Sequence, residues 1–218
     1  MTDMTEKQAI TGFAITLSGL LALITFFFFE IDKAYWLLEE GGIIESASAF
    51  GYLLCAAFVV YQGKLAYLKQ YYYLFLLDIA FMLRELDFDK RFTTMGILKT
   101  KFFVSNNVPL TEKIIGGMIV TFLLYIVIIT LFRHSKDFFR GLREESVISF
   151  GALIVCIFIV LSKVFDGLDR KLKGFGLDMS ETFSMRATVI EEIVELGIPI
   201  IMMLTFSAYF KQYKVNKI

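Results

Sequence analysis

The sequence predicts an all-α membrane protein, built as a bundle of about six transmembrane helices. Hydrophobic residues make up 57% of the 218 residues, and the mean hydropathy is +0.67. With 24 phenylalanines and only 2 prolines, the chain is too apolar for an ordinary soluble domain. A spanning helix needs about 20 mostly apolar residues, and the segments that qualify are 9–30, 43–62, 71–88, 109–132, 147–166 and 187–210. They occupy most of the chain, so residues 1–218 are predicted to form a single transmembrane domain with no separate soluble domain.

The first three spans are each marked by their flanking residues. The first ends in "LITFFFFE" and lacks the short apolar region and small-residue cleavage site of a removable signal peptide, so it is predicted to be a retained helix. The second follows the acidic stretch "EEGGIIE", and the third ends in the charged stretch "LRELD".

The connector between the third and fourth spans is rich in aromatic and basic residues. Apolar side chains recur there at about helical spacing, at Phe88, Phe92, Met95, Leu98 and Phe102. Basic residues occupy the other faces, at Lys90, Arg91, Lys99 and Lys101. This pattern is typical of a helix lying in the membrane interface, here near 88–102, and the alternative is a loop with scattered aromatic residues.

The later spans differ in how they begin. The connector 167–186 is polar and punctuated by glycine, which predicts a loop with a short helical piece. The sixth span then carries "EEIVEL" near its beginning, which places three carboxylates, Glu191, Glu192 and Glu195, in an otherwise apolar helix.

An even number of spans puts both termini on the same side of the membrane. The positive charges of the two sides nearly balance. The connectors 62–70 and 133–146 are compact and basic, which favours cytoplasmic termini.

Ionisable residues from several spans are predicted to lie at a common depth near the opposite surface, given a rise of about 1.5 Å per residue. Asp78 lies about two turns deeper than Glu85 on the same helix face and is the charge nearest the bilayer centre. The candidate ligand-binding residues are Glu45, Asp78, Arg84, Glu85, Asp87, Asp166, Arg170, Arg186, Glu191, Glu192 and Glu195.

Two interpretations of these charges remain open. Acids at a helix N-terminus are stabilised by the helix dipole, which accounts for Glu45 and Glu191. Glu85 and Asp166 lie at helix C-terminal ends, where the dipole disfavours them. Because charge facing lipid is costly and acids outnumber nearby bases, the excess carboxylates are expected to be protonated, hydrated or neutralised by a bound cation. A purely structural ion-pair network is the alternative. In either case one cluster inside the bundle is predicted to contain Glu45, Arg84, Glu85, Glu191, Glu192 and Glu195.

Two classes of function fit such a site. The first is binding or transport of a cation, a proton or a cationic ligand group. The second is a membrane-embedded enzyme that acts on a lipid-like substrate with carboxylates as metal ligands or as general acid and base. The sequence offers no activated nucleophile, so binding ranks above catalysis. A divalent cation such as Mg²⁺, Mn²⁺ or Ca²⁺ would suit oxygen ligands, with the candidate ligands Glu45, Glu85, Glu191 and Glu195.

Other cofactors and partners are less well supported. The single histidine, His134, lies in a basic connector, and both cysteines fall near the middle of spans, so neither a zinc site nor a haem site is expected. The expected partners are the lipid bilayer and a cation or lipid headgroup, not nucleic acid. The sequence leaves the oligomeric state open.

Three short acidic motifs carry a resemblance. In order along the chain, "EEGGIIE", "LRELD" and "EEIVEL" resemble a diffuse group of bacterial multi-pass inner-membrane proteins without an established activity. The resemblance covers about 20 residues. It implies a six-helix protein of the bacterial inner membrane and nothing about catalysis.

Overall fold

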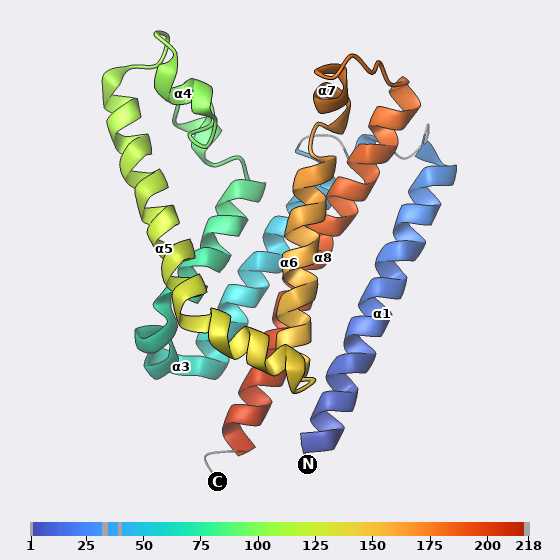
Figure 1. Ribbon diagram of the computed structural model, residues 1–218, viewed down its shortest axis with the longest axis vertical. Coiled ribbons are helices and arrows are strands. Elements are labelled where there is room, and N and C mark those ends of the chain that lie inside the picture. Colours follow the sequence, from blue (N-terminus) through green and yellow to red (C-terminus); the bar gives the residue numbers. More distant parts are fainter. Residues whose placement is uncertain (1, 32–34, 39–40, 216–218) are drawn as a thin grey trace. The chain divides into compact units, whose positions relative to one another are not determined.

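The computed structural model describes residues 2–31, 35–38 and 41–215, which form helices and connectors with no β-strand among them (Figure 1). The α-helices are α1 (Thr2–Phe29), α3 (Ile43–Glu85), α4 (Thr100–Val104), α5 (Leu110–Arg143), α6 (Val147–Phe165), α7 (Leu168–Lys173) and α8 (Glu181–Val215). Two short 3-10 helices, η1 (Tyr35–Leu37) and η2 (Asp89–Arg91), lie in connectors. The predicted all-α class is confirmed.

Five described helices are long and apolar enough to cross a membrane: α1, α3, α5, α6 and α8. The predicted second span lies within α3, and so does the predicted third span, 71–88, except for its last three residues, because α3 ends at Glu85. A straight helix of 43 residues would extend about 65 Å, roughly twice the thickness of the hydrocarbon core. The backbone of α3 instead leaves helical geometry at Lys64 (φ 53°, ψ −169°) and at Tyr71 (φ −124°, ψ 31°). These breaks divide α3 into a first leg, residues 43–63, and a second leg, residues 72–85.

The chain separates into two compact units. The first unit contains residues 1–51 and 138–218, and the second contains residues 52–137. In the first unit α8 packs against both α6 and α1 (Figure 1).

The helices of the first unit approach closely at glycine. A Cβ atom on Gly197 of α8 would lie 2.5 Å from the Phe158 ring of α6 and 2.6 Å from Leu20 of α1. Gly12 of α1 faces Leu204, further along α8. Residue numbers therefore fall along α8 as they rise along α1, so these two helices are antiparallel. Small residues permit this close packing of membrane helices.

In the second unit the two legs of α3 form an antiparallel helical hairpin. The Tyr52 ring of the first leg stacks on the Phe81 ring of the second, with centroids 5.6 Å apart. Three residues further along the first leg, Cys55 interacts with Asp78, which lies three residues earlier on the second. Three residues forward on the first leg thus correspond to three residues backward on the second, as expected for two antiparallel helices.

Helix α5 is bound to the beginning of the second leg. The hydroxyl groups of Tyr72 and Tyr125 lie 2.7 Å apart, and the Tyr73 hydroxyl lies 2.8 Å from Nε2 of His134. His134 was expected in a connector, but α5 continues beyond it to Arg143, and the imidazole is half-buried.

The predicted interfacial helix near 88–102 is not formed as a continuous element. The chain makes the single turn of η2, then bends and re-enters a helix only at α4. The Asp89 carboxylate accepts a hydrogen bond from the Ile97 backbone N–H at 2.8 Å. Of the two alternatives left open by the sequence, the structure therefore has the loop, with short helical turns at its two ends.

This connector folds back on the start of α5. The Glu112 carboxylate of α5 accepts a hydrogen bond from the Thr94 N–H at 2.8 Å. Phe102, expected on a membrane-facing stripe, is fully buried with Ile97 and Val108. In the connector 167–186, α7 is the predicted short helical piece, but the irregular part ends at Ser180, because α8 begins at Glu181.

Candidate functional site

Asp78 is a buried acid of the second unit whose carboxyl oxygens have no hydrogen bond of regular geometry among the described residues. It lies in the second leg of α3 and is 1% exposed. Both carboxyl oxygens are buried, and neither takes part in a hydrogen bond of regular geometry with any described residue. Asp78 precedes Glu85 by seven residues, about 10 Å along the helix.

The hairpin supplies the surroundings of Asp78. Cys55 and Tyr52 of the first leg are both fully buried. The Cys55 thiol interacts electrostatically with the Asp78 carboxyl group. Tyr52 of the first leg stacks on Phe81 of the second. Because the legs are antiparallel, Cys55, three residues after Tyr52, lies opposite Asp78, three residues before Phe81. Sequence reasoning selected Asp78 but missed Cys55, since the pairing depends on where α3 bends.

A carboxylate in such surroundings is costly. An ionised group in an apolar interior is stabilised only by a counter-charge, by hydrogen-bond donors or by a bound ion. Among the described residues, the group that faces Asp78 is the Cys55 thiol, which is only a weak hydrogen-bond donor and makes no bond of regular geometry with either carboxyl oxygen. The Asp78 carboxyl group is therefore suited to hold a proton or to receive a cation.

Glu85 and Arg84 form an ion pair at the end of the same leg. The guanidinium Nη1 of Arg84 lies 3.1 Å from Oε1 of Glu85. Glu85 is 4% exposed, whereas the Arg84 side chain is 32% exposed, so the pair joins a buried acid to a partly accessible base. The next acid, Asp87, pairs with Lys90 at 2.5 Å, and both of these side chains are exposed.

The first unit buries its own acid, Glu195 of α8. Glu195 is 5% exposed, and its Oε1 accepts a hydrogen bond from the fully buried Ser162 hydroxyl of α6 at 2.5 Å. The antiparallel packing of α6 on α8 brings these residues together. Sequence reasoning missed Ser162, because a serine in an apolar span is no signal until its neighbour is known.

The other candidates of the first unit have separate local roles. The Glu45 carboxylate accepts a hydrogen bond from the Gly41 N–H at 2.5 Å, at the first turn of α3, as expected for an acid at a helix N-terminus. Asp166 lies 2.9 Å from Lys163 and 3.9 Å from Arg170. These three residues are partly or fully exposed to solvent.

The last three candidates, Arg186, Glu191 and Glu192, lie in α8, the helix that contains Glu195. The Arg186 guanidinium lies over the Phe28 ring of α1, 5.6 Å from its centroid. Glu191 and Glu192 are half-buried one turn before Glu195. The predicted single cluster draws on residues of both units and stays a prediction.

No group of three or more His, Cys, Asp or Glu side chains in the described part of the chain is placed to hold a metal ion. Divalent metal centres made of several carboxylates require such a group. The four-glutamate ligand set, which also draws on both units, remains a sequence-based prediction.

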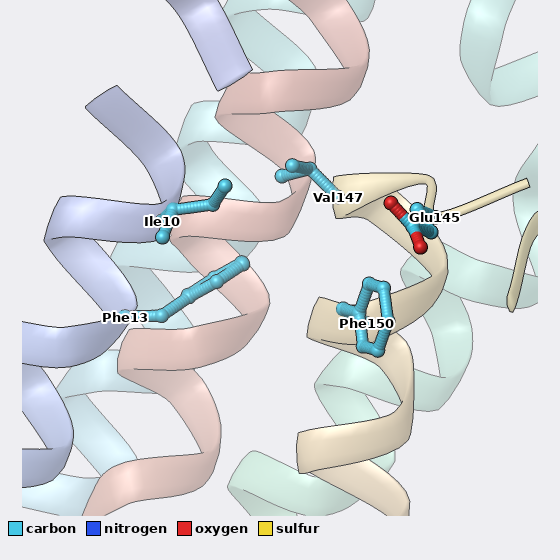
Figure 2. A pocket seen from close by; sticks show the side chains of 5 residues that line it. All are labelled: Ile10, Phe13, Glu145, Val147 and Phe150. Carbon is cyan, nitrogen blue, oxygen red and sulfur yellow. The ribbon is translucent and has the colours of Figure 1, made fainter. Parts of the chain in front are cut away.

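An apolar pocket of about 350 Å³ lies between α1 and the beginning of α6 in the first unit. Figure 2 shows Ile10 and Phe13 projecting from α1 toward α6 and Glu145 in the turn before that helix. Val147 and Phe150 complete its lining. This pocket contains none of the residues selected from the sequence, and its only charged side chain is acidic.

No family model, curated protein or solved structure matches this chain. The roles assigned to its residues therefore rest on geometry and physical chemistry.

Proposed function

We propose that this polytopic membrane protein binds or transports a cation, and that the ion taken up in the second unit is a proton bound by Asp78. The observation that carries the proposal is the fully buried Asp78 carboxyl group, whose two oxygens have no hydrogen-bond partner among the described residues. Ionisable residues inside membrane spans are costly, and they commonly mark ion pathways and proton relays.

The chemistry of the surroundings favours a proton over a divalent metal ion. Mg²⁺ and Ca²⁺ take about six or more oxygen ligands, whereas Asp78 supplies one carboxyl group and faces a thiol. A proton needs one carboxylate oxygen. Proton uptake removes the unpaired charge and therefore the cost of burying it.

The acid-rich ends of the helices belong to the same proposal. Glu85 is a buried acid at the C-terminal end of α3, and Glu195 is a buried acid near the middle of α8. We propose that both termini lie in the cytoplasm of a bacterium; in that orientation the end of α3 that carries Glu85 lies toward the outer face of the inner membrane, where acids attract cations. The compact basic connectors and the resemblance of the three acidic motifs support this orientation and this location.

Carbodiimide labelling tests whether Asp78 holds a proton, because an apolar carbodiimide reacts with protonated carboxyl groups in membranes. The full-length protein in phospholipid vesicles should acquire the label on the peptide that contains Asp78. Asp78→Asn should abolish that labelling, whereas Asp178→Asn, a change at an exposed acid, should leave it unchanged.

Proton movement is measured in the same vesicles with an internal pH-sensitive dye. An imposed ion gradient should change the internal pH when the parent protein is present, and Asp78→Asn should abolish that change. Absence of label at Asp78, or equal proton movement by the parent and by Asp78→Asn, would overturn the proposal.

A further inference from the structure

A shallow groove of about 680 Å³ runs along the outer face of α5 in the second unit. Its floor is a stripe at helical spacing, formed by Ile114, Gly117, Thr121 and Tyr125. Lys113 lies at one end. None of these residues belongs to the Asp78 site.

The length of the groove matches one leaflet of a membrane. From Lys113 to Tyr125 the helix rises about 18 Å. The hydrocarbon core of a bilayer is about 30 Å thick, so each leaflet contributes about 15 Å. Gly117 leaves the floor open, since a Cβ atom there would have only the Phe103 ring within 4 Å, at 3.8 Å.

The upper wall of the groove is held in place by α4. Phe103 lines the groove, and its ring meets the neighbouring Phe102 ring edge to face at 5.0 Å. Phe102 is fully buried, and it lies so near Gly116 that a Cβ atom on that glycine would be 2.6 Å from the ring. The two consecutive glycines thus have distinct roles, because Gly116 admits the anchoring ring and Gly117 keeps the groove open.

The polar groups along the groove are already satisfied or lie at its ends. The Thr121 hydroxyl donates to the Gly117 carbonyl at 2.8 Å, and the Tyr125 hydroxyl is bonded to Tyr72. Glu112, the acid beside Lys113, bonds the connector at Thr94. The groove therefore presents an apolar track with a cation at one end.

These features complement an amphiphile with an anionic head and a hydrocarbon chain. We propose that the groove binds one anionic phospholipid, with its phosphate at Lys113 and one acyl chain along the stripe that ends at Tyr125. The apolar pocket of the first unit does not fit this ligand, because its charged residue is Glu145. The lipid site goes beyond the proposed proton binding and shares no residue with it.

Native mass spectrometry of the full-length protein tests the proposal. The protein is released from micelles that contain equal amounts of phosphatidylglycerol and phosphatidylcholine, and the retained lipids are counted. The parent should retain phosphatidylglycerol preferentially. Lys113→Gln should lower that preference about fivefold, as expected for one basic residue near a membrane surface, and Lys113→Arg should preserve it.

A second variant and a matched control separate the groove from general lipid binding. Gly117→Leu fills the floor and should reduce retention of both lipids. Glu145→Gln and Phe150→Leu alter the other pocket and should change nothing. An unchanged preference in Lys113→Gln, equal retention of the two lipids by the parent, or an equal loss in the control variants would overturn the proposal.

Discussion

Replacing Asp78 with valine should stabilise this protein while removing its proposed proton site. Valine is similar to aspartate in size and in helix propensity, so the substitution mainly removes two buried oxygens that lack partners. A buried polar group left unsatisfied costs about 1–3 kcal/mol. The free energy of unfolding of Asp78→Val should therefore rise by about that amount.

The buried acid of the first unit provides the matched comparison. Glu195 resembles Asp78 in burial but accepts a hydrogen bond from Ser162. Replacing Glu195 with leucine leaves the Ser162 hydroxyl without this acceptor, so Glu195→Leu should lower the free energy of unfolding by about 1–3 kcal/mol. The two substitutions remove similar groups and are expected to act in opposite directions.

Both changes are measured by titrating the protein with sodium dodecyl sulfate in mixed micelles and following helix content by circular dichroism. Parent and variants must unfold in a single transition for the free energies to be compared. A loss of more than about 1 kcal/mol in Asp78→Val would refute the reasoning, because it would show that the carboxyl group makes a stabilising interaction in the folded protein.

Three other predictions concern packing, charge and topology. Gly197→Leu should destabilise the protein by about 1–3 kcal/mol through overpacking, while Gly19→Ala, at a site with open space, should not, as thermal unfolding in detergent will show. Arg84→Ala should cost about 3–5 kcal/mol because it removes a partner of a buried acid, whereas Glu195→Gln should cost much less; equal tolerance in the same assay would indicate only an interfacial belt of charges. Reporter fusions at the carboxyl terminus and within 92–104 should report opposite sides of the membrane, and an exported carboxyl terminus would reverse the proposed orientation.

The sequence by itself determined the class of the protein and the positions of its apolar helices. Composition and the length of apolar runs are local properties, and the constraint that a membrane places on helix length made them decisive. The sequence also singled out Asp78 by its depth in a span. The same local reasoning could not decide between a helix and a loop for the connector 88–102, where the folded chain brings the Ile97 N–H back to the Asp89 side chain.

Tertiary structure alone decided which side chains surround each buried acid. The bend between Lys64 and Tyr71 pairs the two legs of α3 and brings Cys55 opposite Asp78. Packing of α6 on α8 likewise gives Glu195 its serine partner. Which residues far apart in the sequence come into contact is determined by how whole helices pack, that is, by their direction and register. For that reason the burial of Asp78 without a hydrogen-bond partner, on which the proposed function rests, emerged only from the folded chain.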